Sequence, residues 1–162
     1  MKRMFAAACG LVFAAVLAGC GSTTDNLAFK VPAGYSNKMN TFIMSMWQKG
    51  DTDSLSGLIM LMKLPVKMDS SKFDSTTLSS SGTKNMKIES TQSVQICGNQ
   101  TAMLAKATGT SDQVKGKDMN MEMLMTSVGG NSYIAMYMYP QKAAADPDAE
   151  ATIKSVCAKS AT

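Results

Sequence analysis

Two hydrophobic patterns recur along the chain. In some segments apolar and polar residues alternate, and in others apolar residues form short runs; both patterns are typical of β-strands. The alternation is clearest at 119–125, "MNMEMLM", where methionine occupies every second position and therefore one face of a strand. Polar, glycine-rich or proline-containing stretches separate the segments. The pattern predicts strands at 27–35, 40–48, 56–64, 87–96, 101–107, 119–125 and 132–139.

The turn after the methionine run decides which methionines face one another. If the glycines at 129–130 form a two-residue turn, Met123 pairs with Met136 and Met121 pairs with Met138. A turn shifted by one residue pairs a different set on the same face, and a three-residue loop breaks the arrangement.

A helix is predicted near the C-terminus. Asp146 is a suitable N-cap, Pro147 suits the first helical position, and two acidic residues follow near the positive end of the helix dipole. Its apolar face comprises Ala149, Ile153, Val156 and Cys157. A weaker helix, rich in serine and threonine, is predicted from Asp69 or Ser70. Six or seven strands with a terminal helix predict an α+β domain with a mostly antiparallel sheet.

The first twenty residues resemble a bacterial lipoprotein signal. Lys2 and Arg3 precede the apolar run 4–16, which is too short to span a bilayer, and Leu17-Ala18-Gly19-Cys20 follows. "LAGC" in this position resembles the lipobox. The resemblance implies cleavage after residue 19, lipidation of Cys20 and attachment to the membrane through that lipid. The alternative is an ordinary secretory signal or a small membrane helix.

The lipoprotein resemblance also predicts where the domain is held. Residue 21 is glycine rather than an acidic residue, which favours the outer membrane, with the domain facing the periplasm. Residues 1–19 are then the signal peptide, 20–26 a flexible tether, and 27–162 a single α+β domain.

The cysteines predict one disulfide. Cys9 leaves with the signal and Cys20 carries lipid, so Cys97 and Cys157 remain in an oxidising compartment. A redox or metal pair is the alternative, but their spacing is unlike C-x-x-C.

Charge and composition argue against a nucleic-acid-binding protein and against enzymes that depend on histidine. The formal net charge of +4 includes Lys2 and Arg3, so the mature chain carries +2, with scattered lysines and no basic stripe for nucleic acid. The chain contains no histidine, which excludes Ser-His-Asp and Cys-His catalysis and disfavours a zinc site. We expect no enzymatic activity; an enzyme using carboxylates is the weakest alternative.

The mature chain also resembles a family of small exported bacterial proteins with a PsbP-like fold. The stretches that carry the likeness are "VPAGY", "QSVQICGNQTA", "SVGGNSYIAMYMY" and "DPDAEATIKSVC". The resemblance implies a sheet sandwiched between helices and a non-catalytic binding or accessory role, and lends no catalytic residues. The methionine content departs from that family.

The methionines have two interpretations. Because Glu122 and the tyrosines occupy the opposite face, the methionine face is predicted to be the core face, with methionine filling irregular gaps. The alternative is a Cu(I) site on Met121, Met123, Met136 and Met138, since Cu(I) prefers thioether ligands.

The aromatic residues of the opposite face also have two interpretations. Such side chains are most often half-buried under a helix. The alternative is that they line a small-ligand groove, formed by Trp47, Tyr133, Tyr137 and Tyr139.

The sequence therefore predicts a cell-envelope lipoprotein that acts as a non-enzymatic binding or accessory module. Its predicted partner is an envelope protein, and we expect it to need no cofactor. The alternative is a methionine-based Cu(I)-binding protein in metal tolerance.

Overall fold

A computed structural model describes residues 22–51, 53–65, 67, 83–111 and 117–159. Seven strands and one helix, α3, fall within these residues. The strands are β1 (Ser36–Asn40), β2 (Met44–Lys49), β3 (Gly57–Leu64), β4 (Thr83–Ile96), β5 (Gln100–Ser111), β6 (Lys117–Val128) and β7 (Asn131–Pro140); α3 spans Pro147–Ile153. The α+β class and the antiparallel sheet are confirmed.

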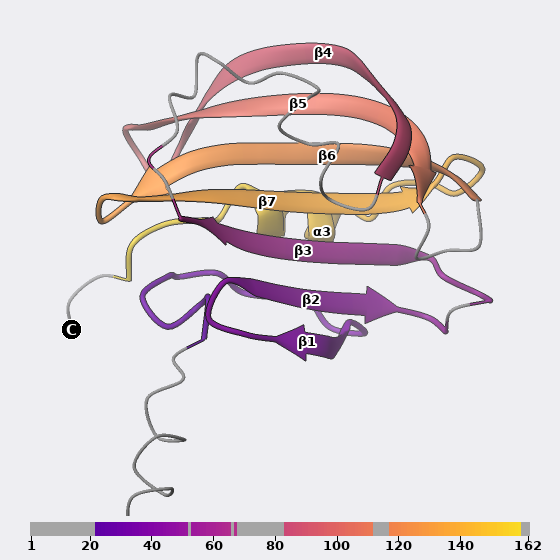
Figure 1. Cartoon of the computed structure of the whole chain (residues 1–162), viewed down its shortest axis with the longest axis horizontal. Helices are drawn as coiled ribbons and strands as arrows, with labels where there is room; N and C mark the ends of the chain where they lie inside the picture. Colours follow the sequence, from indigo (N-terminus) through magenta and orange to yellow (C-terminus); the bar gives the residue numbers. More distant parts are fainter. Residues whose placement is uncertain (1–21, 52, 66, 68–82, 112–116, 160–162) are drawn as a thin grey trace, which may run out of the picture.

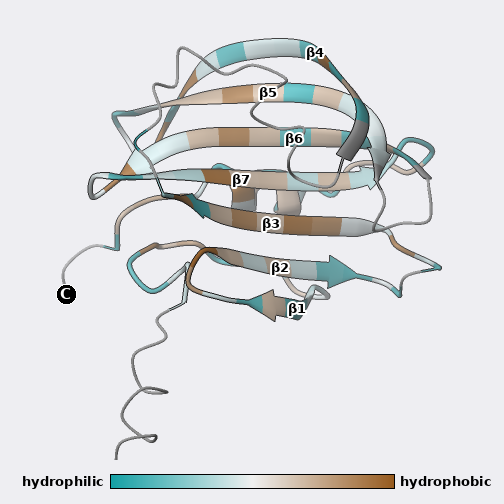
Figure 2. Cartoon of the chain, viewed as in Figure 1, coloured by the Kyte–Doolittle hydropathy of each residue, from teal (hydrophilic) through white to brown (hydrophobic). Residues whose placement is uncertain are grey.

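The strands form one sheet in the order β1-β2-β3-β7-β6-β5-β4, with every neighbouring pair antiparallel. Two meanders, β1 to β3 and β4 to β7, meet where β3 pairs with β7 (Figure 1). The sheet curves, and α3 lies against one face of it, where it packs on β7 and β6. The most hydrophobic stretches run along the central strands (Figure 2).

The hairpin of β6 and β7 has the predicted two-residue turn. Gly129 and Gly130 both have positive φ, 56° and 78°, which the type I′ turn requires and glycine adopts without steric cost. Met121 therefore pairs with Met138, and Met123 with Met136, which is the first of the alternative pairings considered from the sequence.

Both faces of the central strands are buried: the methionine face is buried, as predicted, and so is the face that carries Glu122 and the tyrosines. The helix-side core contains Leu61, Leu124, Tyr137 and residues of α3, including Ile153. The methionine face forms a second buried cluster. Along β6 and β7, residues on both faces of the sheet are buried, so packed side chains cover each face of these two strands.

The C-terminal helix begins as predicted and ends earlier than predicted. The Asp146 side chain accepts from the Asp148 N–H, and Pro147 occupies the first turn. The helix ends at Ile153, so Val156 and Cys157 lie beyond it rather than on its face, although Val156 is fully buried. The remaining chain runs back to the N-terminal segment, where Leu27 bridges to Ala158.

Two N-terminal predictions were wrong. Residues 27–35 form no strand: this segment lies on the helix side, where Leu27 enters the core and Phe29 packs against it. The first strand is β1 instead, a fully exposed edge strand whose polar sequence carries no apolar alternation. The tether is also shorter than expected, because Ser22 onward is folded and Thr23 is only 3% exposed.

The structure joins Cys97 and Cys157 in a disulfide, with their Cα atoms 5.8 Å apart. It connects the β4–β5 turn to the segment after α3, across a sequence separation of 60 residues. Such a loop closure stabilises by about 4 kcal/mol in the chain-entropy picture.

The predicted signal peptide at residues 1–19, the predicted lipidation site Cys20 and the helix predicted from Asp69 or Ser70 lie outside the described residues. Within the described ranges, no helix has the length and apolar character needed to cross a membrane.

Candidate functional site

The methionine face is the most unusual chemical feature of the described residues. Twelve methionines gather on the sheet face opposite α3, seven of them buried and five partly buried. The twelve are Met44, Met46, Met60, Met62, Met86, Met103, Met119, Met121, Met123, Met125, Met136 and Met138. Leu55, Leu58 and Ile134 complete the buried part of the cluster together with small alanines.

Strand register arranges four of these methionines in one continuous row. Met46 pairs with Met60, Met60 with Met136, and Met136 with Met123, across β2, β3, β7 and β6. Side chains in directly opposed positions have Cβ atoms about 4.5–5.5 Å apart, so each methionine contacts the next. We call these four residues the methionine row.

The four candidate copper ligands are brought together. Met121 and Met138 form the cross-strand pair next to Met123 and Met136, and all four side chains are at most 2% exposed. Two adjacent pairs of thioethers supply soft, neutral donors from two strands, a donor set that fits Cu(I). The same burial fits core packing, because methionine fills irregular apolar gaps. Within the described residues no group of three or more His, Cys, Asp and Glu is placed to hold a harder metal.

The opposite face carries an ion pair between a buried carboxylate and an exposed lysine, which the sequence did not predict. Glu122 is 3% exposed, and its Oε1 lies 2.6 Å from Lys106 Nζ on the neighbouring strand. Its Oε2 has no hydrogen-bond partner among the described residues. The hydrogen bond to Glu122 raises the pKa of Lys106, so the lysine stays protonated. A carboxylate this buried normally needs its charge partner, which makes the pair a packing feature of the β5–β6 ladder.

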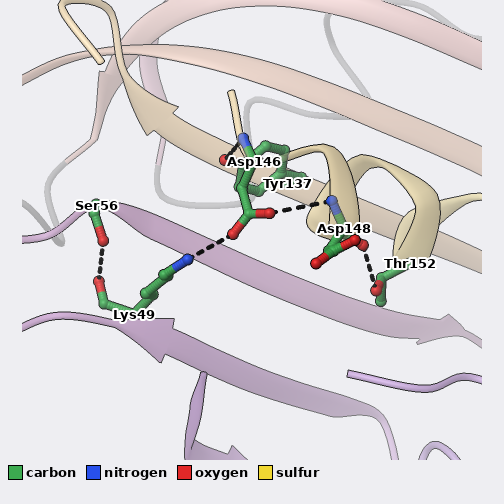
Figure 3. A network of polar contacts seen from close by, with 6 residues as sticks. All are labelled: Lys49, Ser56, Tyr137, Asp146, Asp148 and Thr152. Atoms are coloured by element: carbon green, nitrogen blue, oxygen red, sulfur yellow. Dashed lines mark hydrogen bonds and ion pairs between the residues drawn. The ribbon is translucent and has the colours of Figure 1, made fainter. Parts of the chain in front are cut away.

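A second polar network fastens the start of α3 to the sheet (Figure 3). Lys49 Nζ lies 2.8 Å from Asp146 Oδ2, while Asp146 Oδ1 accepts from the Asp148 N–H at 3.1 Å. The Asp146 N–H in turn donates to the Tyr137 hydroxyl at 2.9 Å. The hydrogen bond from Lys49 holds the pKa of Asp146 below its ordinary value. Every group in this network therefore serves helix placement.

Burial accounts for the tyrosines around this network. Desolvation raises the pKa of Tyr35 and that of Tyr137, so both phenols remain protonated. The Tyr35 hydroxyl also occupies the space beside Gly57, where the Cβ of any other residue would collide with it.

The four aromatics proposed as a groove lie mostly within the helix-side core. Tyr133 and Tyr137 are 3% and 0% exposed, Tyr139 stacks on Tyr137 with centroids 5.0 Å apart, and Trp47 packs on Phe29 at 5.5 Å. This is the arrangement expected of aromatics covered by other elements, rather than of an open groove.

One small pocket of about 200 Å³ lies elsewhere, beside the N-terminal segment. It is lined by Ser22, Thr23, Asp25, Asn26, Phe42, Lys63 and Tyr133. Of the predicted aromatics only Tyr133 borders it, so sequence reasoning missed this pocket; the folding of residues 22–26 onto the β1–β2 turn creates it.

Comparison with known proteins identifies no family. No family model matches the chain, and no curated protein does. Among solved structures, the Ran-binding protein Mog1p of Saccharomyces cerevisiae is similar over 69% of this chain and 70% of its own, with 9% identity and a TM-score of 0.47. Protein PA94 of Pseudomonas aeruginosa, of unknown function, is similar over 68% and 75%, with 11% identity and a TM-score of 0.40. At these values the likeness carries no functional conclusion.

Proposed function

We propose that the protein is a lipid-anchored, non-enzymatic binding or accessory module of a bacterial cell envelope, held at the outer membrane and facing the periplasm. The observation that carries the proposal is the order of basic residues, apolar run and "LAGC" ending at Cys20. The Cys97–Cys157 disulfide supports it, since disulfides persist in oxidising compartments. The partner under this proposal is another envelope protein.

Fractionation of cells that express the full chain tests the anchor. Wild type is expected in the membrane fraction and in the detergent phase after phase separation, because several acyl chains give stable attachment. Cys20→Ser is expected in the soluble fraction or as uncleaved precursor. Cys9→Ser is the matched control, since Cys9 lies in the apolar run of the signal, and it should fractionate as wild type. A Cys20→Ser product that is cleaved to the size of the wild type and still enters the detergent phase contradicts the proposal.

A Cu(I)-binding role is the second candidate, and the adjacent thioether pairs on β6 and β7 are the observation that favours it. A competition titration of the soluble domain against a chromophoric Cu(I) chelator tests it. Stoichiometric uptake should be lost in Met121→Leu/Met136→Leu, which keeps side-chain volume but removes two thioethers. Met39→Leu, an exposed methionine outside the buried cluster, is the control. Absence of uptake by wild type leaves the methionine face as core.

A further inference from the structure

The β1–β2 turn exposes large apolar side chains. Phe42 is 56% exposed and Ile43 61%, and with Met39 at 37% they are the large hydrophobic side chains exposed within the described residues. All three belong to one hairpin. Both turn residues fall inside the predicted strand 40–48, which the structure corrects: β2 begins only at Met44.

Hydrogen bonds hold this turn in place. The Thr41 N–H and hydroxyl both donate to the Met44 carbonyl oxygen at 2.8 Å, and the Met44 N–H donates to the Thr41 hydroxyl at 2.9 Å. On the other side, the Lys63 N–H donates to the Ile43 carbonyl at 2.8 Å. Phe42 and Ile43 therefore project from an ordered turn, and their exposure is a property of the fold.

The N-terminal segment is fastened to the same turn. The Thr23 N–H donates to the Thr41 carbonyl at 3.1 Å, the Thr23 hydroxyl donates to the same oxygen at 2.6 Å, and the Ser22 hydroxyl donates to Asn40 Oδ1 at 2.7 Å. Cys20 precedes Ser22 by two residues, and two residues of chain reach at most about 7 Å. An acyl group on Cys20 must therefore enter the membrane close to Phe42 and Ile43.

Two lysines lie beside the β1–β2 turn and the N-terminal segment. Lys63 Nζ is 4.6 Å from the centroid of the Phe42 ring, and Lys159 Nζ donates to the Asp25 carbonyl at 2.8 Å. A cation beside an exposed aromatic ring is a combination that suits the membrane interface, where the ring enters the headgroup region and the cation meets anionic lipid.

We propose that the β1–β2 turn is a membrane-contact surface: Phe42 and Ile43 enter the headgroup region of the bilayer that holds the Cys20 lipid. The proposal rests on the lipid anchor proposed above. It gives the domain a fixed orientation, in which the end of the sheet with the β1–β2 and β6–β7 turns faces the bilayer. The opposite end, after the ten residues of β7, lies about 33 Å away and is free for a protein partner.

Quenching by brominated lipid tests this orientation in the lipidated full-length protein. Trp47→Phe removes the natural tryptophan, and Phe42→Trp then places one at the turn. Gln141→Trp in the same background is the matched control, because Gln141 is exposed and follows β7 at the far end. The vesicles contain phosphatidylethanolamine, phosphatidylglycerol and acyl-brominated phosphatidylcholine. We expect emission from the Phe42→Trp variant to fall roughly twofold or more, since interfacial residues lie about 5–10 Å deep, and emission from the Gln141→Trp variant to stay unchanged.

Absence of quenching in the Phe42→Trp variant, or equal quenching in the two variants, overturns the proposal. If the indole at position 42 is unquenched in vesicles yet shielded from iodide in native envelopes, a protein covers the turn, and the proposal is again overturned. Ile43→Trp repeats the measurement if circular dichroism shows that Phe42→Trp disturbs the fold. Failure of Cys20 lipidation is detected beforehand by fractionation, so it is distinguished from a lipidated protein whose turn stays clear of the bilayer.

Discussion

Truncation of Met136 measures how much the methionine face contributes to stability. Met136 is 0% exposed and sits inside the methionine row, between Met60 and Met123. Met136→Ala removes three heavy atoms, and at about 0.8 kcal/mol for each buried group the transfer cost is about 2.4 kcal/mol. Incomplete closure of the cavity adds to this, so we expect a loss of about 3–4 kcal/mol, within the usual range for such truncations.

Urea unfolding followed by Trp47 fluorescence and by circular dichroism gives the free energy of unfolding for each variant. Met136→Leu is the volume-matched control and should cost less than about 1.5 kcal/mol. Met123→Ala, alone and combined with Met136→Ala, should show a coupling of at least about 0.5 kcal/mol, because the two side chains are in contact. A loss below about 1 kcal/mol for Met136→Ala would refute the interpretation of this face as close-packed core.

Three further variants test other parts of the fold. Replacing Cys97 and Cys157 together by alanine should destabilise by up to about 4 kcal/mol in calorimetry or urea unfolding, whereas a reductant-insensitive wild type would speak against the bond. Because the folded-state pKa of Asp146 is lowered by Lys49, its contribution is present above the ordinary value of 3.8 and is lost as the pH falls through the lowered pKa. The stability difference between wild type and Lys49→Met should thus shrink below about pH 4, unlike that for Lys142→Met. Gly130→Ala should cost about 1 kcal/mol from positive φ alone, since nothing lies within 4 Å of the new Cβ; an unchanged midpoint would contradict the turn geometry.

Sequence periodicity predicted the sheet well where the strands are long. The methionine spacing predicted that the methionines of the two strands share one face, and pairing of Met121 with Met138 was one of the registers that a two-residue turn allowed. The helix start at Asp146 followed equally from local capping chemistry. In each case neighbouring residues alone determine the structure.

The remaining features depend on tertiary contacts. β1 is an exposed polar edge strand, and its pairing with β2 defines it rather than any apolar pattern. Glu122 occupies a polar position of the alternation, yet it is 3% exposed and pairs with Lys106 of the neighbouring strand, a contact that the alternation does not predict. The ion pair of Lys49 with Asp146 joins residues 97 apart in sequence, so the residues near either one do not predict it.

The exposed β1–β2 turn is another feature that the sequence pattern alone does not predict. Phe42 and Ile43 have the composition of a buried strand, yet the hydrogen bonds between Thr41 and Met44 place them at a tip. Only the fold reveals that the N-terminal segment and these side chains share an edge, which is the basis for the proposed orientation on the membrane.

The central claim, that the chain is a lipoprotein, is tested most directly by mass spectrometry of the N-terminal peptide of the protein purified from membranes. We predict a peptide that begins at Cys20 and carries a diacylglyceryl group on its thiol, with an acyl group on its amine. A peptide that begins at Met1, or a mature N-terminus whose cysteine is unmodified, would contradict the claim and remove the basis for both the anchor and the membrane-facing turn.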